Sequence, residues 1–295
     1  MSSARLLEGV RPAPRATRQP TARVSLQDGL LAGTSLLLFV CYVLPVAAVV
    51  ILSVSLPSPG LHNYIALFGN TTVRTVVGNT VLISVITVSL TVLLAYGAAY
   101  ALVQASPARR QVMLAGVLLP LWVSVLVRSY AWVAVLGSEG LVNTALRGAG
   151  WTGDPLPLVR NTLGVVIGMV HYMLPYAILP LFAQMSRIDR GTVAVARALG
   201  ASPWQAFRHV FLPLSRPGVA AAVFLTGILS LGFYLTPAIL GGGKTVMVAE
   251  FISVQIAETL RWDLATTLST VLLLVSGALV WRYSHLLDLA VGAKA

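Results

Sequence analysis

The sequence predicts an all-α, polytopic membrane protein with about six transmembrane helices. Hydrophobic residues make up 57% of its 295 residues, charged residues only 10%, and the mean hydropathy is +0.85. Several stretches also supply the roughly 20 mostly apolar residues that a helix needs to cross a bilayer. This composition excludes an ordinary soluble domain, in which charged residues are far more frequent.

Six apolar stretches are the expected spans, and they cover most of the chain after residue 29. They run over residues 30–56, 73–104, 112–136, 163–185, 219–240 and 264–287. We therefore divide the chain into a tail, residues 1–29, and a transmembrane domain, residues 30–295. Prolines fall within or near the spans at Pro45, Pro120, Pro175, Pro180 and Pro237. Each removes a backbone hydrogen bond, which predicts either an ordinary kink or a broken helix that lines a cavity.

The net charge of +11 is distributed along the chain in a way that predicts topology. Most of the 20 basic residues lie in the N-terminal tail, at Arg109 and Arg110, in segment 186–218 or near the C-terminus. Segments of membrane proteins that are rich in Arg and Lys stay in the cytoplasm. Both termini and segment 186–218 are therefore expected there. The basic balance reflects topology and does not indicate a nucleic-acid-binding surface.

Residues 1–29 are rich in Arg, Pro and Ala, and we expect them to form a poorly ordered cytoplasmic tail. A cleaved signal peptide does not fit, because the apolar stretch that follows is too long for one. The arginines suggest a mitochondrial transit peptide as the alternative. Glu8, Asp28 and several prolines argue against it.

Segment 186–218, between the fourth and fifth expected spans, has the pattern of two short helices. Asp189 is placed as the N-cap of the first helix, and Gly200 stands where a glycine commonly ends one. Ser202 then caps the second helix, with Pro203 in its first turn and Gln205 three residues after the cap. The segment is therefore expected to be a compact pair of helices that meet at Gly200.

The second short helix has one apolar face, whose residues recur at helical spacing: Trp204, Phe207, Val210 and Phe211. We expect Pro213 to end this helix. A short amphipathic helix on a cytoplasmic loop predicts a docking element for another protein, with the large aromatic side chains as anchors. The alternative is that these aromatics pack against the protein's own inner surface or against lipid headgroups.

No residue pattern in the chain predicts a catalytic or metal site. Its four histidines are scattered without metal-ligand spacing, and its single cysteine, Cys41, lies within an apolar stretch. Residues 241–245, GGGKT, resemble the end of a phosphate-binding loop, but Ala238 stands where that loop needs a glycine. The energy source for any active transport is therefore expected to be another chain.

The cytoplasmic segment resembles the EAA loop of ABC-importer permeases, whose pattern runs roughly EAA, three residues, GA, a helix with a phenylalanine, then LP and PG. The matching positions are Ala196, Gly200, Ala201, Phe207, Leu212, Pro213, Pro217 and Gly218. The departure is at the start, where the Glu-Ala-Ala of the family is replaced by Ala194, Val195 and Ala196. Any charged contact that this glutamate makes to an ATPase subunit has no counterpart at Ala194.

Three further regions resemble the spermidine/putrescine-type permeases in particular. They are residues 128–132 followed by 140–143 (RSYAW and GLVN), residues 168–175 (GMVHYMLP) and residues 232–245 (GFYLTPAILGGGKT). The resemblance runs from about residue 30 to the C-terminus. The same branch includes permeases for iron(III) and other small solutes. A cargo such as iron(III), a small anion or an amino-acid-like compound is therefore the alternative to a polyamine.

The resemblance implies the type I ABC importer permease fold, in a bacterial inner membrane, with transport by alternating access. It also implies a second permease subunit, identical or homologous, two ATPase subunits that carry ATP and Mg, and an extracytoplasmic substrate-binding protein. The chain itself would bind no cofactor and catalyse no reaction. The residues expected to form the ATPase-docking loop are Ala196, Gly200, Ala201, Ser202, Trp204, Phe207, Val210, Phe211, Pro213, Pro217 and Gly218.

One charge and several aromatic residues suggest a translocation path. Arg128 is the only charge well inside an expected span, and such charges mark functional sites unless the side chain reaches the outer interface. Aromatic faces suit the ammonium groups of a polyamine. We expect Glu250 and Glu258 to share one helix face. The candidate path residues are Arg128, Tyr130, Trp132, Tyr172, Tyr176, Phe233, Tyr234, Glu250 and Glu258.

A secondary carrier or a membrane-embedded enzyme is the remaining alternative. An ion-driven carrier usually has acidic residues within its spans, and an enzyme needs clustered His, Cys or carboxylate side chains. The sequence has neither pattern. The prediction is therefore a transport subunit that depends on partner ATPases.

Overall fold

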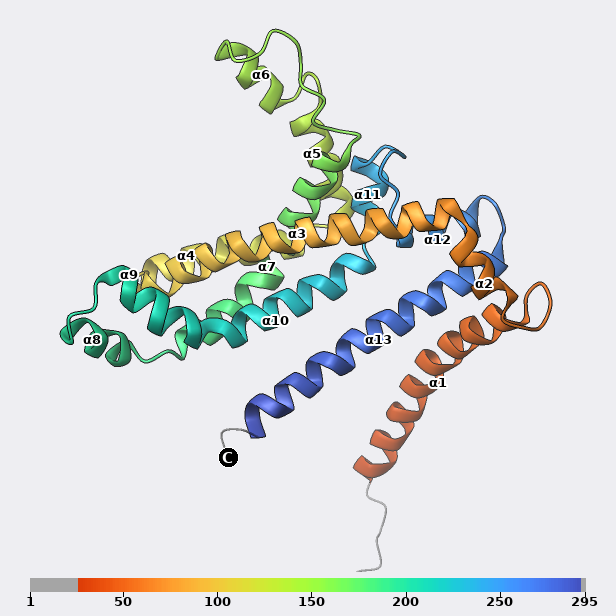
Figure 1. Cartoon of the computed structure of the whole chain (residues 1–295), viewed down its shortest axis with the longest axis horizontal. Coiled ribbons are helices and arrows are strands. Elements are labelled where there is room, and N and C mark those ends of the chain that lie inside the picture. The colour runs from red at the N-terminus through yellow and green to blue at the C-terminus, as the bar shows by residue number, and fades with distance from the viewer. Residues whose placement is uncertain (1–25, 293–295) are drawn as a thin grey trace, which may run out of the picture. The chain divides into compact units, whose positions relative to one another are not determined.

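The computed structural model describes residues 26–292, including the side chains of residues 29–285 except Arg190. These residues form helices joined by turns, with no strand in the described range (Figure 1). The helices are α1 (Leu26–Ser55), α2 (His62–Gly69), α3 (Thr71–Gln104), α4 (Pro107–Leu118), the 3₁₀ turn η1 (Leu119–Trp122), α5 (Val125–Leu136), α6 (Leu141–Gly148), α7 (Thr162–Ser186), α8 (Arg190–Ala198), α9 (Pro203–Ala206), the π-turn η2 (Phe207–Phe211), α10 (Leu212–Leu231), α11 (Leu235–Leu240), α12 (Val248–Ala257) and α13 (Trp262–Gly292).

The chain divides into two compact units, Met1–Ala48 and Val49–Ala295. The described part of the first unit is the apolar beginning of α1, which contains Pro45. The tail expected over residues 1–29 lies outside the described residues, apart from residues 26–29, which belong to α1. The second unit holds all the other helices.

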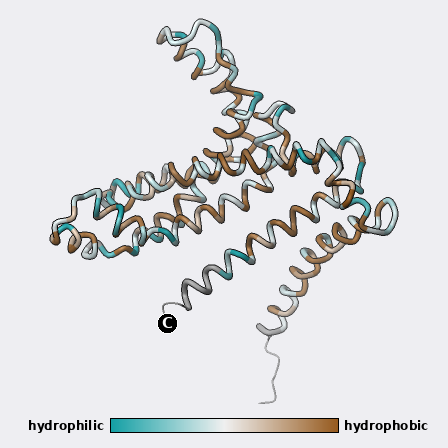
Figure 2. Tube along the Cα trace, in the orientation of Figure 1, coloured by the Kyte–Doolittle hydropathy of each residue, from teal (hydrophilic) through white to brown (hydrophobic). Residues whose placement is uncertain are grey.

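Six helical segments of the described chain are long and apolar enough to cross a membrane, which confirms the predicted number. Hydrophobic residues predominate along the long helices (Figure 2). The segments are Gly29–Ser55, Thr71–Gln104, Val125–Gly148, Thr162–Ser186, Pro203–Leu231 and Trp262–His285. The first, second, fourth and sixth agree with the predicted spans to within a few residues. The third and fifth differ.

The third span, predicted as one helix over residues 112–136, is interrupted. The chain leaves α4 through η1, which contains Pro120, and becomes extended at Val123 and Ser124. The Ser124 hydroxyl then accepts a hydrogen bond from the backbone N–H of Leu126, at 3.3 Å, and so caps α5. A proline followed by an N-cap serine ends one helix and starts another, so the candidate span begins at Val125.

The fifth span was predicted over residues 219–240, after a helix end at Pro213, and both expectations were wrong. The chain is helical without a break from Pro203 through η2 to Leu231. In η2 the Leu212 N–H donates to the carbonyl of Phe207, five residues back. Pro213, which has no N–H to donate, directly follows this wider turn and does not end the helix. The helix then stops at Gly232, and α11 is a separate short helix.

Helices α3, α7 and α10 form the centre of the second unit (Figure 1). Small and hydroxyl side chains line the buried faces of two of them: Thr80, Ser84, Thr87, Thr91, Ala95 and Ala99 on α3, and Ser215, Gly218, Ala222, Thr226 and Ser230 on α10. Membrane helices pack closely through such residues, because apolar side chains gain nothing by leaving lipid.

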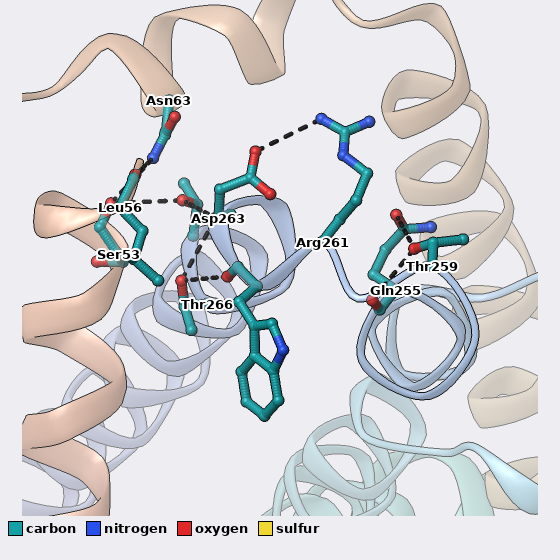
Figure 3. Close-up of polar contacts among 10 residues, drawn as sticks. Ser53, Leu56, Asn63, Gln255, Thr259, Arg261, Asp263 and Thr266 are labelled. Carbon is teal, nitrogen blue, oxygen red and sulfur yellow. Dashed lines mark hydrogen bonds and ion pairs between the residues drawn. The ribbon is translucent and has the colours of Figure 1, made fainter. Parts of the chain in front are cut away.

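Several polar contacts lie near the start of α13 (Figure 3). The Asn63 amide donates to the backbone carbonyl of Leu56, and Arg261 forms an ion pair with Asp263 at 3.5 Å. The Thr259 hydroxyl donates to the side chain of Gln255 at 3.0 Å. These contacts satisfy polar groups where the chain turns between α1, α2, α12 and α13.

Candidate functional site

The loop that carries α8 and α9 is built by local hydrogen bonds, and its predicted caps are confirmed. The Asp189 carboxylate accepts from the Gly191 N–H at 2.9 Å, at the start of α8. At the end of α8, Gly200 has a φ of +95°, which a residue with a side chain rarely adopts. Its N–H donates to the Arg197 carbonyl, and the Ala201 N–H donates to the Ala196 carbonyl. This pair of bonds is a Schellman motif.

The second helix starts with the predicted capping box. The Gln205 N–H donates to the Ser202 hydroxyl at 3.2 Å, and the Ser202 N–H donates to the Gln205 side-chain oxygen at 2.8 Å. Pro203 is the first helical residue, where its missing N–H leaves no bond unmade. The two helices therefore meet at Gly200 in a defined turn.

The aromatic face of the second helix is divided between the protein's interior and its surface. Phe211 is 7% exposed, and its ring packs edge-on against Tyr100 of α3, with centroids 5.2 Å apart. Phe207 contacts both Tyr96 and Tyr100 of α3 in the same manner, at 6.3 and 5.6 Å. Trp204 stacks on Phe207 at 5.7 Å, yet it is 66% exposed. Of these three aromatic side chains, Trp204 alone is mostly exposed.

Hydrogen bonds and one close contact fix this helix to α3 and α7. The Tyr96 and Ser215 hydroxyls are 2.9 Å apart, and the Gln184 side chain donates to the Leu214 carbonyl at 3.2 Å. Gly218 is buried, and a Cβ placed on it would lie 2.8 Å from the Cβ of Gln184. A force applied to α9 would therefore be transmitted to α10 and to its neighbours α3 and α7.

A cavity of about 300 Å³ lies between the loop and the end of α3. Its lining includes Tyr100, Ala194, Arg197 and Phe207. Ala194 is the position at which the EAA pattern has its glutamate. Of the other expected docking residues, Val210 and Pro213 are half-buried and Pro217 is exposed.

The candidate path residues on α5 and α7 meet around Arg128. The guanidinium carbon of Arg128 lies 4.4 Å from the centroid of the Tyr172 ring, within the range of a cation–π contact. Tyr172 in turn stacks with Tyr176, with centroids 5.7 Å apart, and meets Phe233 edge-on at 4.8 Å. Two elements, α7 and the turn before α11, thus contribute to one aromatic cluster, Tyr172, Tyr176 and Phe233, and α5 adds Arg128 beside it.

Arg128 makes no hydrogen bond or ion pair with any described residue, and its Nε and Nη1 are buried. A buried donor without a partner costs about 1–3 kcal/mol, and more when it is charged. Arg128 is therefore held in place mainly by the Tyr172 ring.

His171 lies beside this cluster, although sequence reasoning had set it aside as one of four scattered histidines. The Trp132 indole N–H donates to its Nδ1 at 3.2 Å, and the two rings meet edge-on at 5.5 Å. Residues 128 and 132, and likewise 172 and 176, are four apart and so share a helix face. That spacing could have paired the residues within each helix. It carries no signal that the two faces meet.

The other candidate path residues lie apart from this cluster. Tyr130 and Tyr234 are exposed, at 63% and 40%. Glu250 is buried in the first turn of α12, whereas Glu258 is exposed and follows Ala257, the last residue of α12. The two carboxylates that were expected to share a helix face therefore differ in burial, and only Glu250 lies within α12. α12 lies outside the six candidate spans. Burial raises the pKa of the Glu250 carboxyl, and a hydrogen bond from the Met247 backbone opposes that rise.

Comparisons with known proteins identify the family to which this chain is similar. Residues 92–288 match the model of the binding-protein-dependent transport system inner membrane component. The spermidine/putrescine transport system permease protein PotB of Haemophilus influenzae is 31% identical over 223 residues, which are 76% of this chain and 78% of that protein. PotB of Escherichia coli is 29% identical over 182 residues, which are 61% of this chain and 66% of that protein.

A solved structure also matches this fold. The bacterial alginate ABC transporter, in complex with its alginate-pentasaccharide-bound periplasmic protein, aligns with a TM-score of 0.71 over 89% of this chain and 94% of the matched chain. At 18% identity this likeness shows the fold alone. The family match covers two thirds of the chain, including the α8–α9 loop and the bundle around it. The chain therefore belongs to the family of binding-protein-dependent transport system inner membrane components, the permease subunits of ABC importers.

Proposed function

We propose that this permease subunit moves a polyamine, spermidine or putrescine, into the cytoplasm by alternating access. The names of the PotB relatives support this cargo. The aromatic cluster of Tyr172, Tyr176 and Phe233 supports it chemically, because aromatic faces attract alkylammonium groups. The chain is a transport subunit, and ATP hydrolysis belongs to its partner subunits.

The α8–α9 loop is the proposed docking element for an ATPase subunit, and one observation carries this assignment. The helix that bears the exposed Trp204 continues without a break through η2 into α10. Movement of a partner bound to Trp204 would therefore be transmitted directly to α10, a helix of the central bundle. Large aromatic residues dominate binding energy at protein interfaces, which makes Trp204 the expected anchor.

The complete importer in this proposal contains a second permease subunit, two ATPase subunits with ATP and Mg, and an extracytoplasmic binding protein. Both termini of this chain and the α8–α9 loop face the cytoplasm of a bacterial inner membrane, in line with the positive-inside distribution of Arg and Lys. Among the described residues, no group of three or more His, Cys, Asp or Glu side chains is arranged to hold a metal ion.

Uptake in cells tests the cargo. Labelled putrescine and spermidine are supplied to cells with and without this chain, while the other importer components are present. Saturable uptake that needs the chain and is outcompeted by unlabelled polyamine, and not by iron(III) or amino acids, is the expected result. Uptake that is independent of the chain, or competition by iron(III), would contradict a polyamine cargo.

A further inference from the structure

The contact between Arg128 and Tyr172 places a cation on an aromatic face where α5 meets α7. The guanidinium carbon lies 4.4 Å from the ring centroid. The surrounding groups are neutral or basic: Tyr172, Tyr176 and Phe233 supply rings, and His171 supplies an imidazole. No carboxylate among the described residues pairs with Arg128. Arg128 is half-buried, and a cation with two donor atoms removed from water normally has an ion-pair partner.

The cation–π contact with the Tyr172 ring is the main attractive interaction of the Arg128 side chain. Its Nε and Nη1 are buried without a hydrogen-bond acceptor. If the side chain moved toward water, these donors would recover hydrogen bonds, and only the cation–π contact would be lost. The long, flexible arginine stem permits such a movement without a change in the backbone. The Arg128 side chain would therefore lose only its contact with the Tyr172 ring if another cation displaced it.

We propose that Arg128 is a tethered competitor for an alkylammonium-binding site on the face of Tyr172. The inference rests on the proposed cationic cargo. The site consists of the Tyr172 ring, which Tyr176 supports by stacking and Phe233 by an edge contact. An ammonium group of the cargo and the guanidinium repel each other and cannot share one ring face. The site is thus covered by Arg128 until a cargo cation displaces it.

This arrangement has a consequence for selectivity. A solute that lacks a cationic group has nothing to exchange for the guanidinium, whereas an organic cation replaces it with an equivalent contact. A strongly hydrated inorganic cation gains less from a ring face than an alkylammonium does. Arg128 would therefore discriminate for organic cations along the path and would prevent ions from occupying the empty site.

The test uses the assembled permease–ATPase complex and tetramethylammonium, which has no N–H donors and binds aromatic rings through its charge. Its dissociation constant is measured by a saturation-transfer NMR titration. Arg128→Met uncovers the ring and is expected to bind the probe roughly two- to thirtyfold more tightly than the wild type, the range of a cation–π contact. Arg128→Lys keeps a competing cation and should stay near the wild type. Arg74→Met is the matched control, since Arg74 is exposed on α3.

Two further variants show whether the gain comes from the ring. In the Arg128→Met background, Tyr172→Leu should abolish the gain, and Tyr172→Phe, which retains the aromatic face, should keep it. Unchanged or weaker probe binding by Arg128→Met would overturn the proposal, as would a gain that survives Tyr172→Leu. Loss of the assembled complex in Arg128→Met would also overturn it, because Arg128 would then pair with a partner subunit. The polyamine cargo itself is judged separately, by putrescine uptake of the wild type.

Discussion

Gly218 lies at a close contact between α7 and α10. A Cβ at this position would meet the Cβ of Gln184 at 2.8 Å and the Cα of Leu181 at 3.4 Å, both on α7. The glycine also belongs to the pattern that the loop shares with ABC-importer permeases. A glycine is needed at this position because two membrane helices pack closely there, which is a different role from contact with an ATPase.

Gly218→Ala is expected to lower the apparent melting temperature of the detergent-solubilised protein, because inserting a methyl group into a packed interface costs about 1–3 kcal/mol. Gly227→Ala is the matched control. It lies on the same helix, and a Cβ there would meet nothing within 4 Å. The apparent melting temperatures of the two variants are compared by size-exclusion chromatography of heated samples. Equal melting temperatures would contradict the packing role of Gly218.

Some single-residue features could be predicted from the sequence, and others could not. The caps at Asp189, Gly200 and Ser202 depend on neighbours within a few residues, so local patterns sufficed. The contact of Arg128 with Tyr172 joins residues far apart in the chain. Spacing within each helix gives no information about which helix lies opposite, so this contact was visible only in the structure.

At the scale of the helix, α9 and η2 combine one exposed and one buried aromatic side chain. Trp204 is exposed on α9, whereas Phe211 fills space beside Tyr100 of α3. The sequence predicted one continuous anchor face. Burial divides that face, because the wider π-turn carries the helix into the bundle instead of ending it at Pro213.

Trp204→Ala and Phe211→Ala are therefore expected to fail in different ways. Trp204→Ala should weaken association with the ATPase subunit by roughly thirtyfold, as for a typical aromatic hot spot, and leave the melting temperature of the permease nearly unchanged. Phe211→Ala should lower the melting temperature, because a buried Phe-to-Ala change costs about 3–5 kcal/mol. Copurification and melting give the two readouts. Retention of the ATPase by Trp204→Ala at wild-type affinity would remove Trp204 as the anchor.

We expect the stability of α12 to depend on pH through Glu250. Its folded-state pKa is raised above the ordinary value of 4.5, chiefly by burial, so the folded protein holds the proton more tightly than the unfolded chain. The stability that this provides is complete below that value and is lost as pH rises through the folded-state pKa.

Glu250→Gln is expected to remove that loss, since the amide is neutral at every pH and can still accept the hydrogen bond from Met247. The variant should melt at a higher temperature than the wild type at neutral pH and at a similar temperature near pH 4.5. Glu258→Gln, at an exposed position, should show no such difference. A wild-type protein as stable as Glu250→Gln at neutral pH would show that the carboxyl ionises there without penalty.

The broken third and fifth spans show what composition does not reveal. Residues 112–136 are mostly apolar, yet η1 and the Ser124 cap divide them. Residues 219–240 are also apolar, yet the helix stops at Gly232. α11 then packs so closely on α7 that a Cβ at Gly168 would lie 2.5 Å from Leu240. Hydropathy predicts that such residues lie in the membrane, but it does not predict where their helices end.

For the whole molecule, the topology makes a prediction that cysteine labelling can check. In a Cys41→Ser background, Thr192→Cys on α8 should react with a membrane-impermeant thiol reagent only from the cytoplasmic side. Gly153→Cys, between α6 and α7, should react only from the opposite side. Both positions are exposed. Labelling of the two positions from the same side would contradict the orientation derived from the Arg and Lys distribution.

The most direct test of the central claim is transport by the purified importer in proteoliposomes. The chain is reconstituted with its partner permease, ATPase subunits and binding protein, and labelled putrescine is supplied on the side of the binding protein. We predict saturable accumulation that requires ATP and Mg on the ATPase side and persists when a protonophore is added. Accumulation that proceeds without ATP and collapses with the protonophore would identify an ion-driven carrier and contradict the account.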